Sequence, residues 1–245
     1  MKTKILTFSQ LQEAARLLYQ GQLVAIPTET VYGLAALISS ESAISSIFAV
    51  KKRPADNPLI VHIANLKQLD QIALPPSKLF FQLTEAFFPV PLTMIIPRHR
   101  DLSPLISAGL DSVAIRMPAH PIAMDLIQML EVPIVAPSAN LSGRPSATDM
   151  QHVLDDFDQK ISAVIDGGRS TFGVESTVIS LLSNPPVILR TGNITKQEIE
   201  NVLGRTIDVQ ISLQKGPVYS PGMKYRHYAP CIPVKLFYER EQIDS

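Results

Sequence analysis

Apolar positions along the chain follow a helical spacing in some segments and form short continuous runs in others, and the two alternate. Between Ser9, a suitable N-cap, and Gly21, a suitable helix stop, apolar residues recur on one face of a predicted helix. The apolar run at 23–26 then predicts a strand. The same alternation predicts helices near 41–51, 65–72, 77–87, 121–130, 148–156 and 195–203, and strands at 59–63, 92–96, 113–116, 133–136, 163–166, 177–182 and 186–190.

This interleaving of helices with short, β-branched strands predicts a layered α/β fold with helices on the faces of the sheet. The sheet should be mixed, because the turn-like residues 183–186 join the last two strands into a predicted hairpin. Beyond about residue 205 the pattern weakens. We therefore expect one domain at 1–204, an extended linker at 205–232, and at 233–245 the start of a C-terminal domain that is absent or truncated.

Composition removes several classes of protein. The 245 residues are 46% hydrophobic, enough for a buried core, and 22 basic residues balance 22 acidic ones, so nucleic-acid binding would need a local basic patch. Cys231 is the single cysteine, which excludes an internal disulfide and a cysteine-rich zinc site. No run of about 18 apolar residues occurs, and we expect a cytosolic protein with no membrane association. The Walker, dinucleotide, nucleophile-elbow and HExxH motifs are all missing.

A basic loop is the most informative local feature. Lys51, Lys52 and Arg53 stand between a predicted helix and a predicted strand, and Pro54 and Pro58 stiffen the connection. Such a loop can grip phosphate. The alternative is a solvated helix C-terminus, where cations complement the helix dipole.

Small polar residues gather where other predicted strands end. Segments 27–34, 136–143 and 166–177 each supply hydroxyls, amides or glycines next to a strand, where open α/β sheets commonly bind ligands. Helix capping or an ordinary turn is the alternative for each. Arg116 and Arg190 close apolar strands, where each either pairs with an internal carboxylate or meets an anionic ligand. His62, taken alone, fits a core histidine within its strand.

Taken together, these segments resemble the YrdC-type threonylcarbamoyl-adenylate synthases over about residues 8–204. Five segments in the same order carry the resemblance, and a sixth, SPGMKYRHYAP at 220–230, is similar to the interdomain linker of the longer, two-domain members. The five are PTETVYGL at 27–34, KKRP at 51–54 with NPL at 57–59, AIRMP at 114–118, PSAN at 137–140 with SG at 142–143, and EST at 175–177.

The resemblance implies a fold and a reaction. The fold is a twisted mixed sheet with helices packed around a concave, positively charged cavity. The reaction joins L-threonine, bicarbonate or CO2, and ATP into threonylcarbamoyl-AMP and pyrophosphate, for modification of the adenosine at tRNA position 37. ATP is then a substrate that brings Mg2+, and no metal is held by protein side chains alone.

The resemblance also implies roles for individual residues. Threonine would be held by Thr30, His62, Arg116 and Ser176, with Arg116 on its carboxylate. The nucleotide would be surrounded by Lys51, Arg53, Asn57, Ser112, Ser138, Asn140, Ser146 and Arg190, with Tyr225 or Tyr228 of the linker folding over it as part of a lid. Lys51 and Arg53 would be catalytic, because cations can neutralise charge that moves toward pyrophosphate.

The resemblance also implies partners, and two other functions are alternatives. The labile product implies a downstream tRNA-modifying transferase complex, whereas direct contact with tRNA would be weak. One rival is an RNA-binding module that uses the basic loop without chemistry, although a net charge of zero disfavours it. The other is carbamoyl transfer of the hydrogenase-maturation type, whose proteins are far longer and carry cysteine-rich modules that this chain lacks.

Overall fold

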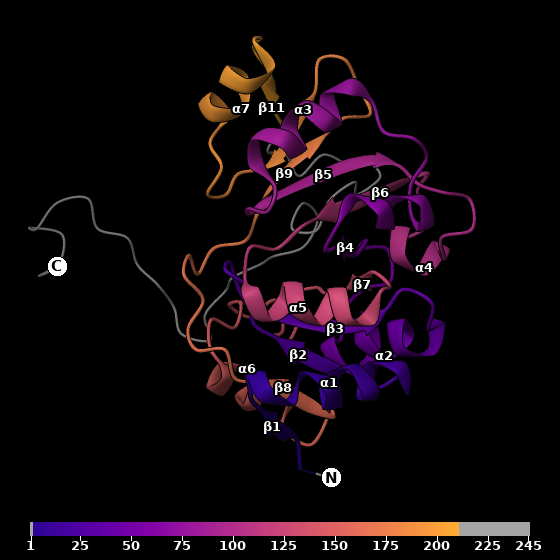
Figure 1. Cartoon of the computed structure of the whole chain (residues 1–245), viewed down its shortest axis with the longest axis vertical. Coiled ribbons are helices and arrows are strands. Elements are labelled where there is room, and N and C mark those ends of the chain that lie inside the picture. The colour runs from indigo at the N-terminus through magenta and orange to yellow at the C-terminus, as the bar shows by residue number, and fades with distance from the viewer. Residues whose placement is uncertain (1, 211–245) are drawn as a thin grey trace, which may run out of the picture.

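A single twisted sheet forms the centre of the protein in a computed structural model, which describes residues 2–210 (Figure 1). Its eleven strands lie in the order β1-β8-β2-β3-β7-β4-β6-β5-β9-β10-β11. The strands are β1 (Lys4–Leu6), β2 (Val24–Ile26), β3 (Gly33–Leu37), β4 (Ile60–His62), β5 (Leu92–Pro97), β6 (Ser112–Arg116), β7 (Ile134–Val135), β8 (Ala163–Ile165), β9 (Thr177–Ser180), β10 (Val187–Arg190) and β11 (Asp208–Val209).

Helices cover both faces of this sheet. They are η1 (Phe8–Gln10), α1 (Leu11–Tyr19), α2 (Glu41–Lys51), η2 (Leu66–Gln71), α3 (Lys78–Phe87), α4 (Pro104–Ser107), α5 (Pro121–Leu130), α6 (Met150–Phe157) and α7 (Lys196–Leu203). Among residues 2–210, none of these helices combines the length and the apolar character needed to cross a bilayer.

The sheet is mixed, as the sequence predicted. β1, β8 and β2 run parallel, as do β4 with β6 and β5 with β9, whereas β2, β3, β7 and β4 pair antiparallel in turn. The predicted hairpin is confirmed: β9 and β10 pair antiparallel, with an irregularity between Ile188 and Arg190.

Two hydrophobic cores lie on opposite faces of the sheet. Neighbouring residues of β2 separate them, since Val24 packs with α1 and α5 while Ala25 packs with the larger core under α2, α3, α6 and α7. The α1 and α5 face continues past β7 onto β4, β6 and β5, where a small cluster around Ile95 and Ala114 is buried. His62 and Arg116 stand on this part of the face, because the register pairs His62 with Ile134 of β7. Because helices cover this part of the sheet less completely, its polar side chains face a pocket.

Some predicted elements differ from the structure. Ser9 does not cap α1; it lies inside η1, and the Gln10 side-chain oxygen accepts a hydrogen bond from Thr7 N (3.0 Å). Strand β3 was not predicted, and its sequence Gly-Leu-Ala-Ala-Leu has no β-branched residue to indicate a strand. It is a strand because β2 and β7 pair with it from both sides. The short β1 and β11 and helix α4 were also not predicted.

Phe80 and Phe81 in α3 provide a matched test of this packing. Phe80 is fully buried, whereas Phe81 is 46% exposed and its ring stacks edge-on against that of Phe80. Phe80→Ala should lower the free energy of unfolding by about 3–5 kcal/mol in a denaturant titration. Phe81→Ala should cost about 1 kcal/mol or less. Equal losses in the two variants would contradict the assigned core.

Candidate active site

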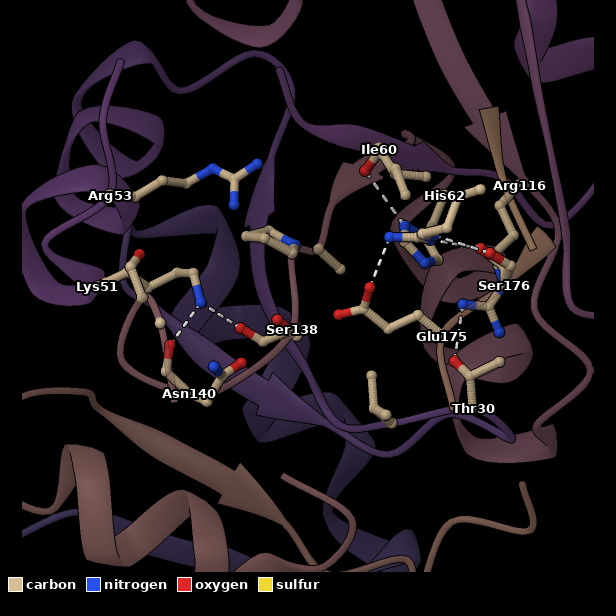
Figure 2. Close-up of a pocket in the computed structure, with 16 residues that line it drawn as sticks. Thr30, Lys51, Arg53, Ile60, His62, Arg116, Ser138, Asn140, Glu175 and Ser176 are labelled. Atoms are coloured by element: carbon tan, nitrogen blue, oxygen red, sulfur yellow. Dashed lines mark hydrogen bonds and ion pairs between the residues drawn. The ribbon is translucent and has the colours of Figure 1, made fainter. Parts of the chain in front are cut away.

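One pocket collects nine of the side chains predicted to bind substrates (Figure 2). They come from strand ends and turns that are far apart in the sequence. Thr30, His62, Arg116 and Ser176 lie on one side of the pocket, whereas Lys51, Arg53, Ser138 and Asn140 lie on the other, and Arg190 lines it too. The two predicted groups therefore share a single pocket.

Arg116 is held at the end of β6 by two neighbours in the turn after β2. Its Nη1 donates to Thr30 Oγ1 (2.9 Å), and its Nη2 forms an ion pair with Glu29 Oε1 (2.5 Å). Burial lowers the pKa of Arg116, and the Glu29 carboxylate opposes that shift. Among the described residues, Arg116 Nε and Glu29 Oε2 are buried without a hydrogen-bond partner. Arg116 therefore has an internal carboxylate partner and lines the pocket as well.

His62 lies beside Arg116 because β4 and β6 pair in parallel with these two residues in register. Burial, followed by the nearby Arg116 charge, lowers the pKa of His62 to about 3. Its Nδ1 lies 3.3 Å from the carbonyl oxygen of Ile60. At neutral pH His62 is therefore an uncharged hydrogen-bonding group.

Ser176 and Arg190 are joined in one network. The Ser176 and Thr93 hydroxyl oxygens lie 2.7 Å apart, and Arg190 donates from Nε to Ser176 O (3.0 Å) and from Nη2 to Ser176 Oγ (3.1 Å). Arg190 Nη1 also forms an ion pair with Glu175 Oε2 (2.5 Å). The guanidinium at the end of β10 thus fixes the segment that enters β9.

Lys51 is buried, which neither interpretation of the basic loop predicted. It is the last residue of α2, and Lys52 (φ 51°) ends the helix in the left-handed conformation and is exposed. Lys51 Nζ donates to the carbonyl oxygens of Ser138 and Asn140, both at 2.5 Å. Burial, with a smaller effect of Arg53, lowers the pKa of Lys51 to about 7. Lys51 therefore fastens the turn after β7 to the end of α2.

Arg53 holds the loop in place with its own side chain. Its Nε donates to Asn57 O (3.2 Å) and its Nη2 to Pro58 O (2.8 Å). Partial burial lowers the pKa of Arg53 to about 10, and the Glu175 carboxylate opposes that shift. The guanidinium remains a cation at neutral pH and lines the pocket.

Three predicted nucleotide-binding residues do not line the pocket. Asn57 is buried and supplies a carbonyl to Arg53, and Ser112 is buried at the start of β6 opposite Pro97. Ser146 is half-buried and donates to Glu175 Oε1 (3.1 Å). Tyr225 and Tyr228 lie outside the described residues.

The sequence interpretation missed the two carboxylates of the site. Glu29 and Glu175 stand within the segments PTETVYGL and EST, but neither was assigned a role. In the sequence, each of the two directly precedes a hydroxyl residue that was predicted to bind threonine: Glu29 precedes Thr30, and Glu175 precedes Ser176. Ser142 and Gly143 also line the pocket, in the turn that Lys51 O holds by accepting from Ser142 N (2.9 Å). No three His, Cys, Asp or Glu side chains within residues 2–210 are grouped so that they could hold a metal ion.

Comparisons with known proteins identify the family of the chain. Residues 16–192 match the family model Sua5_yciO_yrdC, described as "Telomere recombination", and residues 194–245 match a model described as "Threonylcarbamoyl-AMP synthase, C-terminal domain". The fold and the pocket thus define a YrdC-like α/β protein, and the chain belongs to the Sua5/YciO/YrdC family.

Similar proteins are known from bacteria and archaea. Threonylcarbamoyl-AMP synthase of Bacillus subtilis (strain 168) is 49% identical over 229 residues, which are 93% of this chain and 66% of that protein. The enzyme of the same name from Pyrococcus abyssi is 49% identical over 223 residues, 90% of this chain and 66% of that protein. The crystal structure of P. abyssi Sua5 complexed with L-threonine superimposes with a TM-score of 0.90 at 46% identity, covering 93% of this chain and 69% of that one. The chain thus spans about two thirds of these relatives.

Gly192 controls how closely the segment after β10 approaches Glu175–Thr177. A Cβ at Gly192 would lie 2.5 Å from both Glu175 O and Thr177 N, closer than real Cβ contacts. Gly192→Ala should therefore push this segment outward and break the hydrogen bond from Thr177 N to Pro91 O (3.0 Å). Amide hydrogen exchange should show faster exchange at Thr177.

Gly109→Ala is the control for this prediction, because a Cβ there meets nothing within 4 Å although φ is +79°. It should cost about 1 kcal/mol of stability through backbone strain. Unchanged exchange at Thr177 in Gly192→Ala, or an equal change in both variants, would contradict the proposed role of Gly192.

Proposed function

We propose that this protein is an L-threonylcarbamoyladenylate synthase, a nucleotidyltransferase that converts L-threonine, bicarbonate or CO2, and ATP into threonylcarbamoyl-AMP and pyrophosphate. The observation that carries the proposal is the shared pocket, in which cations suited to a triphosphate lie opposite a cluster of hydroxyls, a neutral imidazole and an arginine. The names of its relatives and the L-threonine complex of P. abyssi Sua5 support it.

The threonine side of the pocket offers groups that fit an amino acid. Arg116 would bind the carboxylate, since its Nε is buried and lacks a hydrogen-bond partner among residues 2–210. Thr30 and Ser176 offer hydroxyls, and neutral His62 can donate or accept a hydrogen bond. Apolar Ile60 and Ala136, which also line the pocket, suit a methyl group.

The nucleotide side offers positive charge and hydrogen-bond donors that backbone carbonyls hold in place. Lys51, Arg53 and Arg190 would neutralise phosphate oxygens, while Ser138 and Asn140 contact the nucleotide from the turn after β7. ATP would enter as its Mg2+ complex, because free ATP carries more negative charge than these cations can balance beside Glu29 and Glu175. The metal belongs to the substrate in this proposal.

The substrates supply both nucleophiles of the reaction. The amine of threonine forms a carbamate, and a carbamate oxygen attacks the α-phosphate in line while pyrophosphate leaves. The protein aligns the two and stabilises charge that moves onto the leaving group. An activated serine or cysteine is therefore unnecessary.

Further parts of the proposal concern the rest of the chain and the cell. We assign residues 1–204 to the catalytic domain and 205–232 to a linker, most of which lies outside the described residues. The product would pass to a tRNA-modifying transferase complex that acts at position 37, in the cytoplasm. Binding of tRNA to this chain would be weak.

The direct test is product formation by the purified chain. Incubation with MgATP, L-threonine and bicarbonate should release pyrophosphate and yield an adenylate with the mass of threonylcarbamoyl-AMP. Omission of any one substrate should stop the release, and L-serine should replace L-threonine less well. Salt-sensitive RNA binding without pyrophosphate release would favour the binding-module alternative.

Arg53 and Lys52 give a matched pair for the role of the basic loop. Each substitution by glutamine removes one positive charge, but Arg53 lines the pocket whereas Lys52 is exposed outside it. Arg53→Gln should lower adenylate formation by at least about tenfold, because one lost charge-stabilising donor costs about 2.7–4 kcal/mol in other enzymes. Lys52→Gln should stay within about twofold of the unmodified protein, and similar losses in both would refute the assignment.

Lys51 makes ATP binding depend on pH. Its pKa of about 7 means that the amine loses its proton as the pH rises through that value in the free protein. Phosphate favours the charged form, so binding at about pH 8 should take up a proton, and affinity should fall by up to about tenfold per pH unit above about 7. Calorimetry in buffers of different ionisation enthalpy measures this uptake. Lys51→Met should abolish it, and zero uptake by the unmodified protein would contradict the prediction.

A further inference from the structure

Glu175 is a carboxylate in a pocket otherwise lined by neutral and basic side chains. Of the described residues that line the pocket, Lys51, Arg53, Arg116 and Arg190 are basic, and Glu175 alone is acidic. Its side chain is 16% exposed. A carboxylate in a pocket for a triphosphate weakens phosphate binding, so its presence calls for a function.

The position of Glu175 is tightly fixed. Its Oε2 is paired with Arg190 Nη1, and its Oε1 accepts from Ser146 Oγ (3.1 Å). The next residue, Ser176, is held by Thr93. Figure 2 shows Glu175 between the side with Lys51 and Ser138 and the side with His62 and Thr30. The carboxylate therefore lies at the junction of the two substrate sites.

An amino acid brings a positive group as well as a carboxylate. The basic side chains suit the carboxylate and the phosphates, but they repel an α-ammonium group, which needs an anion within hydrogen-bond reach. The amine must also sit at the junction, because its carbamate has to reach the α-phosphate. Glu175 is the anion that the pocket offers there.

We propose that Glu175 binds the α-ammonium group of threonine and accepts a proton from it as the amine becomes a carbamate, an inference that rests on the proposed function. With bicarbonate, the nitrogen–carbon bond forms and one carbon–oxygen bond breaks. Of the two protons that leave nitrogen, one joins the departing hydroxide to give water and the other goes to Glu175. With CO2, no hydroxide departs and the second proton goes to solvent.

Proton transfer to Glu175 also solves a problem of charge. The reacting group changes from a cation to an anion, and an ionised carboxylate beside it would repel the new carbamate. Once protonated, Glu175 no longer opposes the carbamate, and Arg190 is released to face anionic substrate. Neutral Glu175 then returns its proton to solvent when the product leaves.

Other titratable groups around Glu175 are less suited to this task. Arg190 on β10, Arg116 on β6 and Arg53 after α2 face it as cations. His62 on β4 binds a proton too weakly, since its pKa is about 3, and Lys51 at the end of α2 points at two carbonyls on the nucleotide side. Glu29, the other carboxylate nearby, is paired with Arg116 and is not among the residues that line the pocket.

Glu175→Gln tests the inference, because the amide keeps the size and its oxygen can still accept from Arg190. The probe pair is L-threonine and 3-hydroxybutyrate, which lacks only the amine. The unmodified protein should bind L-threonine at least about tenfold more tightly than 3-hydroxybutyrate, and the variant should lose that preference. Affinity for MgATP should stay the same or rise, whereas loss of a merely structural partner of Arg190 would lower it.

The rate of adenylate formation gives the second readout. In Glu175→Gln it should fall by at least about tenfold near neutral pH and recover as pH approaches the pKa of the free amine, since the substrate then arrives deprotonated. Glu13→Gln is the matched control, because Glu13 pairs with Arg16 on α1 away from the pocket. It should change neither readout.

The outcomes separate the two proposals. An unmodified protein that makes no adenylate would refute the proposed function, while the ligand preference would still show whether Glu175 binds ammonium. An active unmodified protein whose Glu175→Gln variant keeps the threonine preference and the pH profile would overturn the role of Glu175 alone. A variant with reduced MgATP affinity and unchanged preference would make Glu175 a structural partner of Arg190 and overturn it as well.

Discussion

Four positive charges converge on one partly desolvated pocket, and the rest of the site depends on how each is compensated. Moving a cation out of water costs several kcal/mol unless fixed polar groups replace the lost hydration. Lys51 and Arg53 are compensated by neutral backbone carbonyls, whereas Arg116 and Arg190 are compensated by carboxylates. The partners are already in place, so these charges can meet an anion with little reorganisation.

The fold supplies these partners from segments that are distant in sequence. The turn after β7 offers its carbonyls to Lys51 because α2 ends beside it, and the turn after β2 offers Glu29 and Thr30 to Arg116 at the end of β6. Parallel pairing of β4 with β6 sets His62 next to Arg116. If Arg116 were moved by one residue along β6, it would take the place of Ile115 and point to the opposite face, into the larger hydrophobic core. The pairing register of the strands therefore determines which side chains reach the site.

Much of this could be predicted from the sequence, because the signals are local. Apolar periodicity predicted most helices and strands, and the resemblance to a known family, carried by short local segments, named nine side chains that line the pocket. What could not be predicted depends on non-local pairing. β3 is made a strand by its neighbours in spite of its alanines, and Lys51 is buried because carbonyls 87 and 89 positions further along the chain receive it. Neither the strand β3 nor the burial of Lys51 can be predicted from the residues next to it in the sequence.

The different compensation of Arg116 and of Lys51 and Arg53 also bears on the ligands that the proposed function assigns to them. Carbonyls are neutral, so a phosphate that approaches Lys51 or Arg53 meets a cation that donates hydrogen bonds to carbonyls, and Glu175 is the carboxylate that acts on both from within the pocket. A carboxylate that approaches Arg116 meets Glu29 nearby and Glu175 across the pocket, so a simple acid is repelled there. A zwitterion brings its own positive group and satisfies a carboxylate while it pairs with the arginine. Under the proposed function, this arrangement of counter-ions would favour an amino acid beside Arg116 and a polyphosphate beside Lys51 and Arg53.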